Sequence, residues 1–197
     1  MIILGITGGI GSGKSTISEI FSLCDVPVYI ADVESKRLTN TSSVIRKKLI
    51  DLYGDDIYNN DGLLNKIKLA SIIFGNKEEL EKVNSIIHPE VKKNLCEWIV
   101  ENDKSSIVAY ESAIMFESGF HSLTDKIITV YTPLEIRIDR IIKRDNSSRE
   151  KALERIHSQM ADEEKVKLSD YVVVNDDTQS LIQQVLDILN QLNENIK

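Results

Sequence analysis

The sequence predicts an α/β fold in which a five-stranded parallel sheet is flanked by helices. Apolar runs of strand length alternate with segments of helical periodicity, which is typical of a mainly parallel sheet covered on both faces. The run Ile2–Thr7 stops at glycines and reads as a buried strand, and apolar residues recur at helical spacing from Lys14 to Leu23. A second strand is expected at Val26–Ala31, so that strand, glycine loop, helix and strand form a βαβ unit of about thirty residues.

Three further strands and several helices follow from the same reasoning. Helical patterning dominates residues 32–101, and a structureless connection of that length is rare, so we expect an inserted helical subdomain there. Proline is common at the first position of a helix, so helix starts are expected at Pro89 and at Pro133, the latter with Thr132 as N-cap. A capping box predicts another helix start after Ser147. The remaining expected elements are strands at Ser106–Tyr110, Lys126–Tyr131 and Tyr171–Val174 and a last helix from about Gln179 to Leu192.

Composition excludes several classes of protein. An apolar content of 42% and a charged content of 28% are ordinary for a globular chain of 197 residues, so whole-chain disorder is not expected. A net charge of −7 argues against a general nucleic-acid binder. The two cysteines and three histidines are scattered and match no zinc spacing. No apolar stretch reaches membrane-spanning length and no basic leader precedes the first strand, which predicts a cytoplasmic protein with no membrane partner.

The segment Gly8–Ser15 matches the pattern G-x-x-x-x-G-K-[ST] completely. Glycines at these positions allow consecutive backbone N–H groups to turn inward and cradle phosphate oxygens, and the following helix adds the positive end of its dipole. In such a loop Lys14 bridges the β- and γ-phosphates of ATP, and the Ser15 hydroxyl is a ligand for Mg²⁺. The nucleotide-binding set predicted from this motif is Gly9, Gly11, Ser12, Gly13, Lys14, Ser15 and Thr16.

Acidic residues that follow strands are candidates for catalysis, because ligands bind beyond the carboxyl ends of parallel strands. Asp32 follows the second strand and is the candidate general base that takes the proton of an acceptor hydroxyl; the alternative is that it caps a helix over Val33–Thr39. Glu111 follows the third strand and is a candidate for holding Mg²⁺ through water, with Glu117 as second choice.

Three arginines are spaced to line one face of a helix: Arg137, Arg140 and Arg144, with Arg149 shortly after them. A solvated charged face is the usual explanation for such a run. In a P-loop kinase, however, a mobile lid supplies arginines that neutralise the charge on the transferred phosphate. The spacing alone leaves both explanations open.

These motifs, in this order, resemble the dephospho-CoA kinase family. The first strand and phosphate loop, Gly5–Thr16, are very similar to the family's own. Asp32 matches the second aspartate of the family's Asp-Ala-Asp motif, although Ile30 stands in place of the first, and Ala113 replaces the proline of its Pro-Leu-Leu-Phe-Glu motif. The other matching residues are Ile87-His88-Pro89, Ile114–Glu117, Thr132–Glu135, Arg140, Arg144-Asp145, Ser148–Glu150, Gln159, Asp170 and Asn175.

The resemblance implies a P-loop NTPase fold with three parts. Residues 1–31, 102–137 and 169–197 form the core, 32–101 a helical subdomain for the CoA-type substrate, and 138–168 a helical lid. It also implies an activity: transfer of the γ-phosphate of ATP to the 3′-hydroxyl of the dephospho-CoA ribose, with Mg²⁺. Among the lid arginines, it implies that Arg140 is catalytic and that Arg144 binds the nucleotide. The expected partner is the small-molecule substrate, and the chain is expected to be a monomer or a small homo-oligomer.

Two other functions remain open at this point. One is a kinase for a different alcohol, such as a nucleoside, a nucleotide or a sugar acid. The other is a nucleotide-dependent switch, which binds nucleotide tightly but has no phosphate acceptor. A GTPase is not expected, because the guanine-reading pattern N-K-x-D is absent from the sequence.

Overall fold

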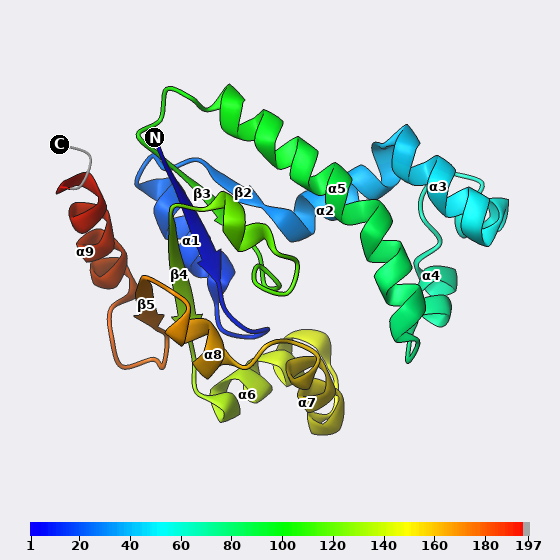
Figure 1. Cartoon of the computed structure of the whole chain (residues 1–197). Coiled ribbons are helices and arrows are strands. Elements are labelled where there is room, and N and C mark those ends of the chain that lie inside the picture. The colour runs from blue at the N-terminus through cyan, green and yellow to red at the C-terminus, as the bar shows by residue number, and fades with distance from the viewer. Residues whose placement is uncertain (195–197) are drawn as a thin grey trace. The chain divides into compact units, whose positions relative to one another are not determined.

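The structure is a computed structural model in which residues 1–194 are described (Figure 1). The chain divides into two compact units. The first joins Met1–Ile30 to the described residues from Glu101 onward, and the second is Ala31–Val100. Among the described residues, no helix combines the length and apolarity needed to cross a bilayer.

The first unit is built on a sheet of five strands that are all parallel, as predicted. The central strand β1 pairs with β3 on one side and with β4 on the other, and the spatial order is β2-β3-β1-β4-β5. This order places the carboxyl end of β1 in the middle of the sheet edge, where the glycine loop begins. The strands are β1 Ile2–Thr7, β2 Val28–Ile30, β3 Ile107–Glu111, β4 Lys126–Tyr131 and β5 Tyr171–Val174.

One face of the sheet packs against two helices, α1 (Lys14–Leu23) and α9 (Leu181–Glu194). Side chains alternate between the faces of a strand, so Leu4 and Ile6 of β1 point to the same side. Both are fully buried with Phe21 of α1 and with apolar residues of α9 in one core cluster. This packing fixes the direction in which α1 leaves the glycine loop.

The other face is covered by irregular chain and by a short helix. The segment after β3 folds back through the 3₁₀ turn Phe120–Leu123, and the Tyr110 and Phe120 rings lie 6.0 Å apart. Next to it α8 (Asp162–Lys167) lies on β4, where the Thr129 hydroxyl is 2.6 Å from that of Ser169.

Helices α6 (Leu134–Asp145) and α7 (Arg149–His157) form a hairpin whose small apolar core includes Ile138, Ile141, Ala152 and Ile156. Two predicted starts were shifted by one residue. Pro133 rather than Thr132 is the N-cap of α6, and Ser148 rather than Ser147 caps α7 by accepting from Lys151 N. Thr132 is not a cap because its hydroxyl is used elsewhere, as described below.

The second unit is helical, with its own apolar core that includes Ile45, Leu49 and Ile57. The predicted helix start at Pro89 was wrong, because α5 runs through this proline without interruption. Pro89 removes one backbone donor from the helix. Ile86 and Val91 are buried on either side of it, and their packing stabilises the helix through the proline. The elements of this unit are α2 Ala31–Thr41, α3 Ser43–Tyr53, the 3₁₀ turn Asp55–Ile57, α4 Lys66–Ile73 and α5 Lys77–Glu101.

Candidate functional site

The glycine loop connects β1 to α1 at the centre of the sheet edge (Figure 1). Helix α1 begins at Lys14, and its first turn contains no acidic residue, so the positive end of the helix dipole is not neutralised there. Lys14 is buried, and its ammonium group donates to the carbonyl of Gly9 at 3.2 Å across the loop. The side chains of Ser15 and Thr16, in the same turn, are exposed. The loop therefore presents a cationic, donor-rich surface suited to phosphate.

Gly13 is the N-cap of α1 and has a φ of 90°, in the left-handed region that favours glycine. Its carbonyl accepts from Thr16 N at 3.1 Å and so closes the first turn of the helix. A Cβ at this position would overlap the amide nitrogen of Asn175, which approaches the loop from the end of β5. The glycine is thus required both by the backbone conformation and by a neighbour.

The ends of β4 and β5 hold the loop at one carbonyl. Asn175 Nδ2 donates to Ser12 O at 2.8 Å, and the Thr132 hydroxyl lies 2.9 Å from both Ser12 O and Asn175 O. All three residues are buried. In a planar trans peptide, a Ser12 carbonyl that is held from outside the loop directs the N–H of Gly13 toward the opposite side, where a phosphate would bind.

Arg140 reaches the same place from α6. Its Nη2 donates to Asn175 Oδ1 at 3.2 Å and to Asp177 Oδ1 at 2.9 Å. Its Nη1 is buried and has no hydrogen-bond partner among the residues that the structure describes. This donor lies 3.8 Å from where a Cβ at Gly13 would be. The structure therefore brings Arg140 to the phosphate loop with one N–H donor that could bind a phosphate oxygen.

The other arginines of the predicted lid pair with carboxylates of α6. Arg144 makes two hydrogen bonds to Asp145, at 2.8 and 3.0 Å. Together with Arg155, these bonds hold the pKa of the Asp145 carboxyl far below its ordinary value. Arg149 forms a two-point pair with Glu135 and so ties α7 to α6. Arg144 is thus not brought to the phosphate loop in this structure.

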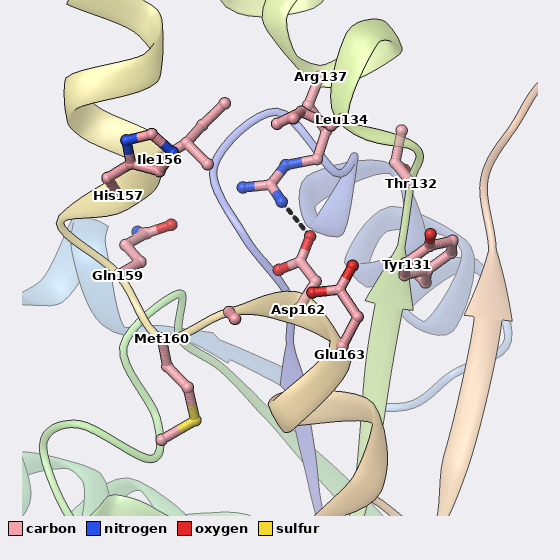
Figure 2. Close-up of a pocket in the computed structure, with 11 residues that line it drawn as sticks. Tyr131, Thr132, Leu134, Arg137, Ile156, His157, Gln159, Met160, Asp162 and Glu163 are labelled. Carbon is pink, nitrogen blue, oxygen red and sulfur yellow. Dashed lines mark hydrogen bonds and ion pairs between the residues drawn. The ribbon is translucent and has the colours of Figure 1, made fainter.

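Arg137, the third member of the arginine row, is buried and not solvated. It forms an ion pair with Asp162, the first residue of α8 (Figure 2). Its Nε donates to Ile10 O at 2.9 Å. Burial raises the pKa of the Asp162 carboxyl and lowers that of the Arg137 guanidinium, while each partner opposes the shift of the other. The pair lines a cavity of about 360 Å³ between α6, α8 and the end of β4.

The three acidic candidates occupy different surroundings. Glu111 is 4% exposed at the end of β3, in register with Ile6 of β1. Glu117 accepts from Met160 N at 2.8 Å and pairs with the buried ammonium group of Lys165 at 3.0 Å. Asp32 belongs to the second unit, with its side chain exposed. The alternative role of Asp32 as a helix N-cap was wrong: strand β2 ends at Ile30 rather than Ala31, and the helix has already begun when it reaches Asp32.

The described residues contain no cluster of three histidine, cysteine, aspartate or glutamate side chains that could hold a metal ion. This is compatible with Mg²⁺, which is usually held by one or two protein oxygens together with substrate phosphates and water. The exposed Ser15 hydroxyl in the first turn of α1 is an oxygen donor of the required kind.

Sequence reasoning assigned no supporting role to the residues that hold the loop from outside, although Thr132, Gln159 and Asn175 were among those that match the family pattern. Thr132 was interpreted as a cap, and Arg137 as one member of a charged row. No local pattern singled out Asp162. Asn175 also carried a positional signal, because it directly follows the last strand, the position at which side chains of a parallel sheet meet ligands.

Comparison with known proteins gives consistent matches. The family model for dephospho-CoA kinase matches residues 2–180. The dephospho-CoA kinase of Bacteroides fragilis is 46% identical over 193 residues, covering 98% of this chain and 94% of that protein. A solved structure of a Thermus thermophilus protein superposes with a TM-score of 0.84 at 30% identity, covering 96% of each chain. The dephospho-CoA kinase of Campylobacter jejuni superposes with a TM-score of 0.72 at 26% identity, covering 99% of this chain and 98% of that one.

Proposed function

The chain belongs to the dephospho-CoA kinase family, and on this premise we propose roles for the individual residues of its site. The reaction transfers the γ-phosphate of ATP to the 3′-hydroxyl of the dephospho-CoA ribose and gives CoA and ADP, the last step of coenzyme A biosynthesis. The observation that carries the assignment of the nucleotide site is the phosphate loop at the end of β1, which lies inside the matched region and is braced by β4 and β5.

The loop residues Gly9 and Gly11–Thr16 bind the ATP phosphates, through backbone N–H groups that are not used within the loop and through the Lys14 ammonium group. Lys14 is already directed across the loop by its hydrogen bond to Gly9 O. Arg140 neutralises charge on the transferred phosphate, and its buried Nη1 is the donor available for this role. Mg²⁺ would be held by the Ser15 hydroxyl together with phosphate oxygens, and it supplies charge neutralisation.

Asp32 acts as the general base for the ribose hydroxyl. Its place in the chain supports this role, because it follows β2 by two residues and its exposed carboxylate is not used as a helix cap. The helical unit Ala31–Val100 then serves as the substrate subdomain, as the family resemblance implies. Ile30, in place of the family's first aspartate, leaves Asp32 as the carboxylate at this point of the chain.

Residues 138–168 serve as the lid. For Arg144 to contact nucleotide, its two hydrogen bonds to Asp145 must be exchanged for bonds to phosphate. This exchange is feasible because the Arg144 side chain is 58% exposed and Asp145 keeps a second partner, Arg155. Arg140 needs no such exchange for its buried donor.

The experiment that tests the proposal is ADP release by the purified chain with ATP and Mg²⁺, with and without dephospho-CoA, and with nucleosides and gluconate as decoy acceptors. We expect turnover with dephospho-CoA alone, with CoA as the product. Lys14→Ala and Asp32→Asn should each lower turnover by about two orders of magnitude or more. Lys14→Ala should also weaken ADP binding, whereas Asp32→Asn should not.

Each alternative predicts a different result. Turnover on a decoy but not on dephospho-CoA would assign the chain to another alcohol kinase. Tight ATP binding without any acceptor would indicate a nucleotide-dependent switch. Near-normal turnover of Asp32→Asn would remove Asp32 as the base and leave the nucleotide site intact.

A further inference from the structure

The phosphate loop is held at Ile10 as well as at Ser12, again by polar side chains that lie outside the loop. Ile10 N donates to Gln159 Oε1 at 2.8 Å, and Ile10 O accepts from Arg137 Nε at 2.9 Å. Both backbone groups of Ile10 are therefore bonded to the protein, and neither serves to bind a phosphate oxygen in this arrangement. Gln159 comes from the connection between α7 and α8, and Arg137 comes from α6.

The same point is fixed by packing and by charge. The Ile10 side chain packs against the apolar core of the α6–α7 hairpin. The Arg137 guanidinium is held in place by Asp162, and these two residues are 5% and 4% exposed, respectively. Figure 2 shows Arg137 pointing from α6 toward Asp162, with Gln159 on the neighbouring chain segment. Ile10 is thus held through its side chain, its N–H and its C=O, all by residues 137–162.

We propose that Arg137, Gln159 and Asp162 are positioning residues for ATP binding, which fix the Ile10 peptide and thereby orient the N–H groups of Gly11 and Gly13–Ser15 toward the phosphates. Ser12 N is used within the loop, where it donates to Gly9 O at 3.1 Å. The inference rests on the proposed nucleotide site. Its physical basis is that a glycine-rich loop is conformationally free, and ordering it in advance lowers the cost of binding. Because the peptide unit is planar and trans, holding Ile10 O also fixes the direction of Gly11 N–H, which belongs to the same unit.

A single substitution cannot separate positioning from stability. Removing Arg137 alone leaves the buried carboxylate of Asp162 without its partner, which is strongly destabilising. Replacing both partners by apolar residues of similar size is often neutral for stability. The double variant Arg137→Met with Asp162→Leu therefore removes the hydrogen bond to Ile10 O and keeps side chains of similar size in the two buried positions.

Gln159 supplies an independent test, because it carries no charge. Gln159→Met removes the acceptor for Ile10 N, and Gln159→Glu keeps an oxygen in the same place. Lys126→Met is the matched control. It breaks an ion pair with Asp170 at 2.8 Å in the same unit, near the start of β4 and not at the loop.

The experiment measures three quantities for each variant: the dissociation constant for ADP by calorimetry, KM for ATP together with kcat, and the melting temperature. We expect the double variant to melt close to the wild type, while its KM for ATP and its Kd for ADP rise about ten- to a hundredfold and kcat changes less. Gln159→Met should weaken ADP binding about five- to tenfold, the loss of one hydrogen bond. Gln159→Glu should recover part of that loss, and Lys126→Met should bind ADP as the wild type does.

Wild-type ADP affinity in Gln159→Met, or in a folded double variant, would overturn the inference. If the double variant does not fold, Gln159→Met and Gln159→Glu decide the question. The proposed acceptor is tested separately, since ADP calorimetry uses no dephospho-CoA. Loss of ADP affinity in the variants, with no phosphate transfer by the wild type, would retain the positioning residues and reject the acceptor.

Discussion

The substitution Gly13→Ala tests whether the loop is fixed by its neighbour on β5 as well as by its backbone conformation. Holding alanine in the left-handed conformation costs about 1–2 kcal/mol. The new Cβ would also displace the Asn175 amide, which bonds to Ser12 O at 2.8 Å and to Arg140 at 3.2 Å. Losing these bonds in a buried place costs about 2–3 kcal/mol more. The free energy of unfolding should therefore fall by about 3–5 kcal/mol in total.

Gly119→Ala is the matched control. Gly119 has a φ of 74°, and no atom lies within 4 Å of the Cβ that alanine would add, so only the backbone cost of about 1–2 kcal/mol applies. The two variants should differ by about 2–3 kcal/mol, or by about 4–12 °C in melting temperature for a chain of this size.

The assay is urea denaturation of both variants beside the wild type, followed by ADP calorimetry. We expect Gly13→Ala to bind ADP at least about tenfold more weakly, a loss of about 1.4 kcal/mol, because the first turn of α1 moves with residue 13. Equal stability of the two variants, together with wild-type ADP binding by Gly13→Ala, would refute the reasoning.

Two further predictions concern ion pairs. Lys165→Met leaves the carboxylate of Glu117 and the carbonyl of Ala113 without their buried cationic donor, so the free energy of unfolding should fall by about 2–4 kcal/mol. Adding Glu117→Gln removes the unpaired carboxylate and should recover part of this loss in urea denaturation. No recovery would contradict the electrostatic explanation. The second concerns the Asp145 carboxyl, whose pKa is lowered in the folded state, so its stabilisation is present above the ordinary value of 3.8 and is lost as the pH falls through and below it. Melting temperatures between pH 5 and pH 3 should accordingly fall less steeply in Asp145→Asn than in the wild type, and parallel slopes would argue against the pairing.

Much of the architecture was predictable because its signals are local. A buried strand that stops at glycines and leads into an amphipathic helix is a short-range pattern, and β1 and α1 have the predicted bounds. The strands Lys126–Tyr131 and Tyr171–Val174 were also predicted without error. Boundaries shifted where a residue had two possible uses. Thr132 has the composition of a helix cap, yet its hydroxyl bonds the carbonyls of Ser12 and Asn175, and the helix begins later.

Pro89 shows the opposite case, in which packing overrides a local rule. Proline at the first position of a helix is the common arrangement, and the sequence around it gave no reason to expect anything else. In the structure, buried residues on both sides carry α5 through the proline. Which residues are buried depends on contacts between distant parts of the folded unit, so a short stretch of sequence does not show it.

The sequence by itself determined the phosphate loop, the five strands and the residue types that bind phosphate, because spacing within one short segment specifies them. Only the tertiary structure decided which side chains hold that loop. Gln159 lies 149 positions from Ile10, and Asn175 lies 163 from Ser12. Arg137, Arg140 and Arg144 are alike in type and spacing; the fold buries the first against Asp162, places the second beside Gly13 and leaves the third at the surface. Such differences arise from contacts between distant segments, and one-dimensional spacing does not encode them.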